Sequence, residues 1–493
     1  MLLGIDVGTG STKGVLADRD GRVLDSVAIA HEVSFPRTGH VEFDAEVAWA
    51  EVAEIARRLL AGRDATRLDG MCVSAMGPCL VVTGDDLVPL RPTILYGIDS
   101  RAGAQITALE RELGAAEIFE RCGKMLSAQA IGPKLRWIRD EEPEVFSAAT
   151  RWHSLAGWLV ARLTGEHVID HHTASQSDPM YDVRAGRWHP DWAARAAEHI
   201  AMPRLAWAAD VVGTVTAAAS AATGLPVGVP VCAGTVDAWA EAISAGVRDP
   251  GDLMLMYGST MFFVEVLGAW HAHEKLWTTQ GVEPGTLTMA AGMSTSGTLT
   301  QWVQRVTGGA PFEELIAEAE RVPAGSDGLL LLPYFAGERT PVFDDEARGV
   351  IAGLTLRHGR GHLLRAAYEG VACGIRQVVS YLDGAGEPVR RLVAVGGGTK
   401  AALWTQIVSD VTGRPQDVPE QTIGASYGDA MMAAIGTGVL PAGTTWARVA
   451  RTIEPDPASA DLYGELFAAY EGLYPALRAQ MHLLAGIQRR TGA

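Results

Sequence analysis

Cysteines, basic side chains and long apolar runs are all scarce in this 493-residue chain. The five cysteines are scattered without CxxC or zinc-ligand spacing, which excludes a disulfide framework and predicts a reduced, cytoplasmic protein. Apolar windows such as 328–335 break well short of 18 residues, and the N-terminus lacks the pattern of a signal peptide. We therefore expect no membrane span and no secretory leader.

Positive charge is also in short supply. The chain has 41 Lys and Arg residues against 58 Asp and Glu residues, for a net charge of −17. A chain this acidic lacks the basic face that nucleic-acid binding needs, so we expect no nucleic-acid partner. The apolar content of 48% is nevertheless that of an ordinary globular protein, and the length predicts two or three domains.

The first half combines strands and helices in the manner of an α/β domain. Strands are predicted at 2–7, 13–17 and 22–28, joined by tight turns into an antiparallel meander. Asp44 is a plausible N-cap for a following amphipathic helix, and another strand is predicted at 70–74. The middle of the chain is mostly helical and includes a helix predicted at 151–165.

The second half repeats the opening pattern of strand, small-residue turn and returning strand. Strands at 253–257 and 260–266 flank Gly258 and Ser259, and Gly258 lies 250 residues after Gly8. We interpret this as two halves built on one plan, with a boundary near 246–251, although two glycine hairpins can also arise by chance. Three further helices are predicted at 362–382, at 402–412 before Gly413, and at 462–487.

The segment 6–14, DVGTGSTKG, has the composition of a phosphate-binding hairpin. Backbone N–H groups of a glycine-rich turn can converge on phosphate oxygens, and Thr9, Ser11 and Lys13 add donors. It is neither a Walker loop nor a Rossmann fingerprint, because Lys13 occupies the third glycine position and a strand follows. The alternative is a purely structural hairpin that Asp6 caps.

Two further glycine-rich turns extend this hypothesis. The hairpin at Gly258 offers the same chemistry as the first, and two such hairpins across a cleft would hold a nucleoside triphosphate. The three glycines at 396–398 follow a strand, and they permit a base or ribose to approach the backbone closely. The alternative for this turn is a tight strand-to-helix connection without a ligand.

Asp237 is the candidate catalytic residue. It lies where a predicted strand ends and a helix begins, a usual place for site residues in α/β sheets. Phosphoryl transfer to a hydroxyl group requires a positioned carboxylate that accepts the proton. The alternative is an Asp that only caps the helix.

Five segments together resemble one known family. They are GIDVGTGSTKGVL at 4–16, CAGTVDAWAEAISAG at 232–246, MYGSTMFF at 256–263, YFAGERTPVFDDEARGVIAGL at 334–354 and VGGGTKAALWTQIVSDVTG at 395–413. In order and spacing the chain resembles the FGGY carbohydrate kinases of the actin-like ATPase superfamily, most of all the xylulose kinase branch. The resemblance covers nearly the whole chain.

The resemblance implies an α/β fold of two actin-like (ribonuclease H-like) domains with a nucleotide cleft between them. Residues 1–246 would bind the sugar, and residues 247–493 would mainly bind ATP. It implies ATP and Mg²⁺ as cofactors, a small sugar or polyol as substrate, and a homodimer by analogy. The residues it assigns are Asp237 as catalytic base, Asp6 for Mg²⁺, Thr9, Ser11, Lys13, Gly258 and Ser259 for the phosphates, Gly297 and Gln301 for the nucleotide, and Gly396 and Gly397 beside the adenine.

The departures from the family all fall on the sugar side. Where xylulose kinases carry Gln-Met-His, with the Met-His pair touching the sugar, the segment 74–78 reads SAMGP, so Gly77 and Pro78 replace the imidazole donor. Asp99 survives in a following segment as a candidate partner of sugar hydroxyls, together with Asp237. D-xylulose leads the candidate substrates, followed by ribulose, gluconate, erythritol or another polyol. The adjacent His171 and His172 are expected in a solvated loop rather than in a metal site.

Two alternatives to a sugar kinase remain open at this point. An actin-like ATP-binding protein without sugar kinase activity would hydrolyse ATP without any sugar, and Asp237 with the GERTP segment argues against it. A sugar-sensing protein derived from a kinase would bind its ligand without phosphoryl transfer, and the preserved ATP-side motifs argue against that.

Overall fold

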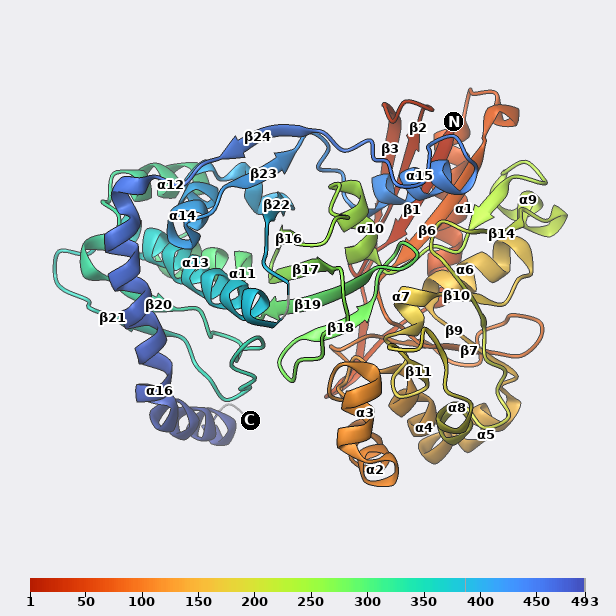
Figure 1. Cartoon of the computed structure of the whole chain (residues 1–493), viewed down its shortest axis with the longest axis horizontal. Coiled ribbons are helices and arrows are strands. Elements are labelled where there is room, and N and C mark those ends of the chain that lie inside the picture. The colour runs from red at the N-terminus through yellow and green to blue at the C-terminus, as the bar shows by residue number, and fades with distance from the viewer. Residues whose placement is uncertain (386, 492–493) are drawn as a thin grey trace. The chain divides into compact units, whose positions relative to one another are not determined.

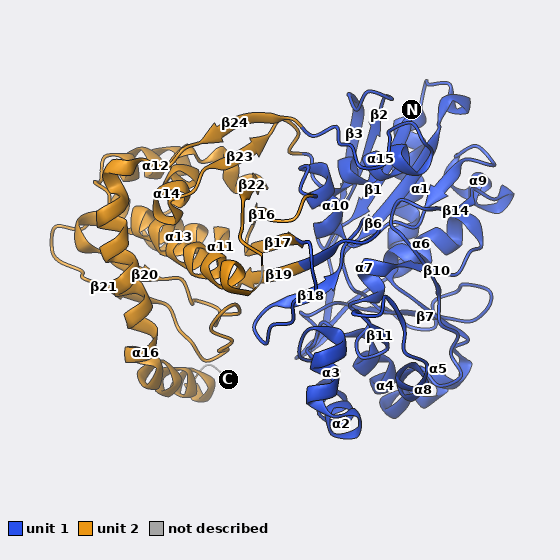
Figure 2. Cartoon of the chain, in the orientation of Figure 1, with its two compact units in different colours: residues 1–248, 267–288, 423–447 blue, residues 249–266, 289–422, 448–493 orange. Residues whose placement is uncertain are grey.

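The computed structural model describes residues 1–385 and 387–491. The chain divides into two compact units (Figure 2). Unit 1 comprises Met1–Arg248, Leu267–Thr288 and Ile423–Ala447, and unit 2 comprises Asp249–Val266, Met289–Thr422 and Arg448–Ala493. The predicted boundary at 246–247 lies beside the point where the chain first passes from unit 1 to unit 2, between Arg248 and Asp249. The predicted division into two continuous halves differs from these units, because two later segments return to unit 1.

Unit 1 is built on a six-stranded sheet in the order β14-β15-β6-β1-β2-β3. The strands β1, β2 and β3 form the predicted antiparallel meander, and β6 and β15 continue the sheet in parallel with β1. The bounds are Leu2–Val7 (β1), Ser11–Ala17 (β2), Val23–Ala30 (β3), Gly70–Ala75 (β6), Val211–Thr214 (β14) and Pro230–Cys232 (β15).

Helices cover both faces of this sheet (Figure 1). Helix α1 (Ala45–Leu60) begins at Asp44, whose side chain accepts from the Glu46 N–H as predicted, and it packs on β2 at Gly14. Helix α15 (Ala425–Gly436) lies on the opposite face, where a Cβ atom at Gly4 would overlap the Ser426 carbonyl oxygen. The absence of a side chain at these two glycines therefore lets each helix sit directly on the strands.

The remaining part of unit 1 has its own core around Trp152, Leu135 and Tyr181. The other helices of unit 1 are Gly103–Leu113 (α2), Ala115–Cys122 (α3), Ile131–Glu141 (α4), Pro143–Ala148 (α5), Leu155–Thr164 (α6), His171–Ala174 (α7), Pro190–Ala196 (α8), Ala217–Thr223 (α9) and Asp237–Ser244 (α10). The shorter strands of unit 1 are Ser34–Arg37 (β4), His40–Phe43 (β5), Val81–Thr83 (β7), Thr93–Ile94 (β8), Arg151–His153 (β9), Val168–Asp170 (β10), Tyr181–Asp182 (β11), Arg187–Trp188 (β12), Arg204–Ala206 (β13) and Trp277–Gln280 (β18).

Unit 2 contains the strands β19, β17, β16, β22, β23 and β24 side by side in that order. Their bounds are Leu287–Met293 (β19), Met261–Leu267 (β17), Asp252–Tyr257 (β16), Arg391–Val395 (β22), Gln416–Pro419 (β23) and Val449–Ile453 (β24). The other elements are Leu330–Leu332 (β20), Val350–Ala352 (β21), Gly297–Val306 (α11), Phe312–Glu320 (α12), Arg360–Ala385 (α13), Ala402–Thr412 (α14) and Ala460–Thr491 (α16).

The two sheets share one strand plan, as the repeated hairpin predicted. In unit 1 the pairs β2–β1, β1–β6, β6–β15 and β15–β14 are antiparallel, parallel, parallel and antiparallel. In unit 2 the pairs β17–β16, β16–β22, β22–β23 and β23–β24 follow the same sequence of directions. The hairpin at Gly8 and the hairpin at Gly258 occupy equivalent places in these sheets.

Two local predictions are wrong. Residues 151–153 form strand β9, paired with β7, and the helix α6 begins only after Ser154, whose hydroxyl accepts from the Gly157 N–H. His172 is fully buried rather than solvated: its ring lies 3.8 Å from the Trp239 ring centroid, and its Nδ1 lies 2.9 Å from the Gln280 carbonyl oxygen. Burial lowers the pKa of His172 to about 3, so the ring stays neutral.

All five cysteines are free, as the scattered spacing predicted, and all five are buried. In the part of the chain that the structure describes, no helix has both the length and the apolar character needed to cross a bilayer.

Glu265 on β17 creates a pH dependence of stability. It is fully buried, and neither carboxylate oxygen has a hydrogen-bond partner in the described residues. Burial, with Asp383 and Glu387 nearby, raises its pKa to about 8. A raised folded-state pKa stabilises the fold fully below the unfolded-state value, and this contribution is lost as the pH rises toward 8.

We expect Glu265→Gln to abolish this loss of stability at rising pH, because glutamine cannot ionise in the unfolded chain. Urea unfolding of both proteins from pH 4 to pH 8 tests this. The variant should gain stability over the wild type steadily as the pH rises from about 4.5 to 8. A stability difference that does not change with pH would contradict the assignment.

Candidate active site

The segment that carries Asp237 is held by three sets of contacts. Strand β15 ends at Cys232, and α10 begins at Asp237, so the predicted strand-to-helix position is confirmed. Gly234 adopts a φ of +71°, and a Cβ atom there would overlap the Val73 carbonyl oxygen. Thr235 accepts a backbone hydrogen bond from Ala75 at 3.2 Å and donates through its hydroxyl to Asp170 Oδ2 at 2.8 Å.

Asp237 is a half-buried carboxylate at the first turn of α10. Burial raises the pKa of Asp237 to about 6, although the hydrogen bond from the Ala238 N–H and the charge of Lys13 both lower it. Glu241 lies one helical turn later on the same helix, and burial together with Asp237 raises the pKa of Glu241 to about 7. At neutral pH, Asp237 is therefore ionised and able to accept a proton.

Two more carboxylates share one hydroxyl close to Asp237. Ser74 Oγ, at the end of β6, lies 2.7 Å from Asp429 Oδ2 and 3.3 Å from Asp6 Oδ1. Asp6 is buried at the end of β1, and Asp429 is fully buried on α15. Burial raises the pKa of both groups well above the usual range, with a further contribution from Asp237 in the case of Asp6.

The chemistry of this cluster fits a hard divalent cation. Asp429 Oδ1 is buried without a hydrogen-bond partner in the described residues, and carboxylate oxygens are the ligands that Mg²⁺ prefers. Across residues 1–385 and 387–491, no three His, Cys, Asp or Glu side chains are grouped to hold a metal by themselves. This is compatible with Mg²⁺, which usually binds one or two carboxylates together with substrate phosphates and water.

The hairpin between β1 and β2 presents donors beside this cluster. The Gly8 N–H donates to the Ser11 carbonyl at 3.0 Å, and Thr9 Oγ1 lies 3.0 Å from the Tyr96 hydroxyl. Ser11 is half-buried, whereas Gly10 and Lys13 are exposed. Lys13 lies opposite Asp6 in the register of β1 and β2, and its positive charge lowers the pKa of Asp6, Asp237 and Glu241.

We expect Lys13→Met to shift the pH profile of activity. Loss of the ammonium group removes an influence that lowers the pKa of Asp237, so the acidic limb of kcat should move up by about one pH unit. The KM for ATP should rise about tenfold, the cost of one charged hydrogen bond. Steady-state kinetics from pH 5 to pH 9 measures both, and Lys13→Arg, which keeps the charge, should stay close to the wild type. An unmoved acidic limb would show that Lys13 does not act on Asp237.

In unit 2, the second hairpin is tied to the start of α11. The Gly297 N–H donates to the Gly258 carbonyl at 3.0 Å, and the N–H groups of Ser296 and Thr298 donate to the Ser259 carbonyl at 3.0 and 3.1 Å. A Cβ atom at Gly297 would lie 2.7 Å from the Gly258 carbonyl oxygen. The structure thus brings three of the predicted nucleotide-binding residues together, and Gln301 lies exposed on the same helix.

The turn that follows β22 is shaped by close backbone packing. Gly396 has a φ of +89°, and a Cβ atom there would lie 2.7 Å from the Tyr257 carbonyl oxygen. Gly397 is exposed, and a Cβ atom there would meet nothing within 4 Å. The backbone at Gly397 is therefore open to a planar group, as the predicted role beside adenine requires.

On the predicted sugar side, one glutamine side chain connects two turns of unit 1. Gln129 Nε2 donates to the Gly77 carbonyl at 3.2 Å and to Gln176 Oε1 at 3.1 Å. Its Oε1 accepts from the Gly97 N–H at 2.9 Å. Gly77 is half-buried and Pro78 is buried, so the main-chain atoms of Gly77 are the accessible part of the pair.

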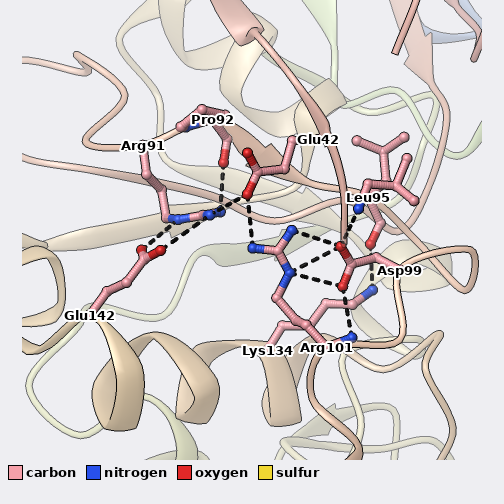
Figure 3. Close-up of polar contacts among 9 residues, drawn as sticks. Glu42, Arg91, Pro92, Leu95, Asp99, Arg101, Lys134 and Glu142 are labelled. Carbon is pink, nitrogen blue, oxygen red and sulfur yellow. Dashed lines mark hydrogen bonds and ion pairs between the residues drawn. The ribbon is translucent and has the colours of Figure 1, made fainter. Parts of the chain in front are cut away.

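Asp99 lies in a buried ion-pair cluster rather than on an open surface (Figure 3). Its carboxylate accepts from the Val41 N–H at 2.6 Å and from Arg101 Nη2 at 2.7 Å. Burial opposes ionisation, but these hydrogen bonds outweigh it and hold the pKa of Asp99 below its usual range. Arg101 also reaches Glu42, which bonds Arg91 in turn. The contact of Asp99 with a sugar hydroxyl stays a prediction.

Sequence reasoning missed Glu241, Asp429 and Gln129. Glu241 follows Asp237 by four residues, so helical periodicity after a candidate base is the signal that finds it. Asp429 meets Ser74 from 355 residues away, and no local pattern announces that pairing. Gln129 stands in a loop without a motif.

Two family models match the chain in succession. The model of the FGGY family of carbohydrate kinases, N-terminal domain, matches residues 1–244, and that of the C-terminal domain matches residues 251–437. Together they cover most of the sequence, including both hairpins, Asp237 and the turn at Gly396.

Individual relatives resemble the chain over nearly its whole length. A solved xylulose kinase from Rhodospirillum rubrum is 32% identical, with a TM-score of 0.89 over 98% of this chain and 99% of the other. The xylulose kinase of Bacillus subtilis (strain 168) is 27% identical over 96% of each chain. The gluconokinase of the same bacterium is 25% identical over 89% of this chain and 88% of its own.

Proposed function

The chain belongs to the FGGY family of carbohydrate kinases, and from that premise we propose that it transfers the γ-phosphoryl group of ATP to a hydroxyl group of a ketopentose, with D-xylulose the first candidate. The observation that carries the mechanism is the position of Asp237. It is an ionised carboxylate at the start of α10, beside Lys13 and the carboxylates Asp6 and Glu241.

In the proposed reaction, Asp237 accepts the proton of the attacking sugar hydroxyl. The N–H groups of residues 9–11 in the hairpin and the Lys13 ammonium group bind phosphate oxygens and stabilise the charge of the transferred group. The hairpin of Gly258 and Ser259 and the open backbone at Gly397 are proposed to bind the rest of the nucleotide. Bound Mg²⁺ would neutralise phosphate charge, with Asp6 and Asp429 as the carboxylates able to hold it.

The basic side chains of the cluster around Asp99 favour a neutral sugar over a sugar acid (Figure 3). Arg91 and Arg101 have 7% and 0% of their side chains exposed and are already paired with carboxylates. Lys134 is also buried, and its ammonium group donates to the Leu95 carbonyl. None of these three side chains therefore offers a free cation to the carboxylate of gluconate. The similarity to several xylulose kinases supports the same choice.

The test is ADP release with Mg-ATP against ketoses, polyols and sugar acids. We expect the highest kcat/KM with D-xylulose and weak activity with gluconate. A preference for another neutral sugar would replace the substrate and keep the kinase assignment. Sugar-independent ATP hydrolysis alone would contradict the kinase assignment. Cytoplasmic location and a homodimer stay predictions, the latter checked by sedimentation of the purified chain.

A further inference from the structure

A buried histidine lies directly behind the hairpin 8–11. His31 follows β3, and its backbone N–H donates to the Gly10 carbonyl at 3.2 Å. Only 4% of its side chain is exposed, and its ring lies 4.7 Å from the Phe43 ring, centroid to centroid. Its Nε2 atom lies 2.9 Å from the Gly8 carbonyl oxygen. His31 thus contacts the hairpin backbone at two points.

The other ring nitrogen faces a buried carboxylate. His31 Nδ1 lies 2.9 Å from Glu51 Oε2, and Thr12 Oγ1 donates to the same oxygen at 2.6 Å. Glu51 lies on the face of α1 that packs against the sheet, and Thr12 is fully buried on β2. A carboxylate in this surrounding needs a compensating charge and hydrogen bonds, and His31 and Thr12 supply them.

The Gly8 carbonyl fixes the proton on one side of the ring. A carbonyl oxygen only accepts, and an ionised carboxylate only accepts. Nε2 therefore carries a proton and donates it to the Gly8 carbonyl. A single proton joins Nδ1 and Glu51 Oε2, and the ring is an imidazolium when Nδ1 holds that proton.

We propose that His31 is a positioning residue of the phosphate-binding hairpin, held by Glu51 and Thr12. It fixes the Gly8 carbonyl, so that the neighbouring N–H groups keep their direction toward a polyphosphate. With Nδ1 protonated against an ionised Glu51, the ring also places a positive charge behind those N–H groups. The inference rests on the proposed function of the hairpin as a phosphate site, and it names residues that touch neither nucleotide nor sugar.

The test is equilibrium binding of AMP-PNP, a non-hydrolysable ATP analogue, and of AMP to the full chain without sugar. His31→Leu should weaken AMP-PNP binding about tenfold, the scale of one charged hydrogen bond. Binding of AMP should change little, because AMP lacks the β- and γ-phosphates. His31→Gln, whose amide can replace Nε2, should recover part of the loss. His167→Leu is the matched control, because the His167 ring also contacts a backbone carbonyl, that of Trp152 at 2.9 Å.

Glu51→Gln separates charge from geometry. Thr12 and His31 contact the same Glu51 oxygen, so an amide nitrogen in its place can donate both to the Thr12 hydroxyl and to a neutral His31 ring, which then still donates to Gly8. We expect weaker AMP-PNP binding than in the wild type and stronger binding than in His31→Leu. Wild-type affinity in Glu51→Gln would overturn the charged pair, and wild-type affinity in both His31 variants would overturn the whole proposal.

Failure of the proposed function would look different, since the wild type would then bind AMP-PNP without any sugar-dependent ADP release. If His31→Leu does not fold, the Gln variants at 31 and 51 still decide the question.

Discussion

Asp237→Asn lowers kcat by about a thousandfold or more, while the affinity for AMP-PNP stays within a factor of about two, if Asp237 is the general base. The asparagine keeps the size of the side chain and its place at the start of α10 but cannot accept the proton of the sugar hydroxyl. Steady-state kinetics with the best sugar, together with AMP-PNP titration, separates the two effects. Asp210→Asn, an exposed carboxylate of the same unit, serves as the control.

The same assignment fixes the pH dependence of the wild type. Because burial raises the pKa of Asp237 to about 6, the carboxylate is protonated and inactive below that value. We expect kcat to rise with pH through about 6 and then to level off. The residual activity of Asp237→Asn should lack this rise of kcat near pH 6. If the variant kept near-normal turnover, or the same rise of kcat near pH 6, Asp237 would be excluded as the base.

The local parts of the site could be predicted from the sequence because local rules fix them. The meander at 2–28, the place of Asp237 between strand and helix, and helix α14 with Gly413 at its end all follow from turn residues and periodicity. Gly413 adopts the left-handed conformation with a φ of +66°, as a helix C-terminus of this kind requires. The repeated hairpin in turn predicted the shared strand plan of the two units.

Side-chain contacts decide what the sequence could not indicate. Asp99 looks like an accessible polar residue, yet Arg101, two positions later, pairs with it out of solvent. His172 looks solvated beside His171, yet Trp239 and Gln280 enclose it. In both cases a side-chain contact decides whether the residue is exposed. Neither the composition nor the hydrophobic periodicity of the sequence indicates such a contact.

Helix α15 is the largest element whose place the sequence did not predict. It lies at 425–436, within the half assigned to ATP, but it packs in unit 1 on the sheet that carries Asp6. This packing brings Asp429 to Ser74. The determinants are glycines at two different contacts of the helix: Gly4 on β1 leaves room for the Ser426 carbonyl of α15, and Gly428 on α15 leaves room for the Ala240 carbonyl of α10. Nothing local marks Gly428 as different from any other helical glycine.

Gly428→Ala should therefore be strongly destabilising. A Cβ atom at this position would overlap the Ala240 carbonyl oxygen of α10, and neither helix backbone can move aside without displacing Asp429 or the start of α10 at Asp237. Overpacking of this kind costs about 3 kcal/mol of unfolding free energy, more than alanine gains by its helix propensity. Urea unfolding measures the loss, and kinetics should show a lower kcat in the folded fraction.

Gly472→Ala on α16 is the matched control, because its Cβ atom would meet nothing within 4 Å. There, alanine should stabilise the helix by about 0.5 to 1 kcal/mol, through its propensity alone. The same substitution thus has opposite signs on two helices of one chain. If Gly428→Ala were as stable as Gly472→Ala, close packing of α15 on α10 would not be what places Asp429 beside Ser74.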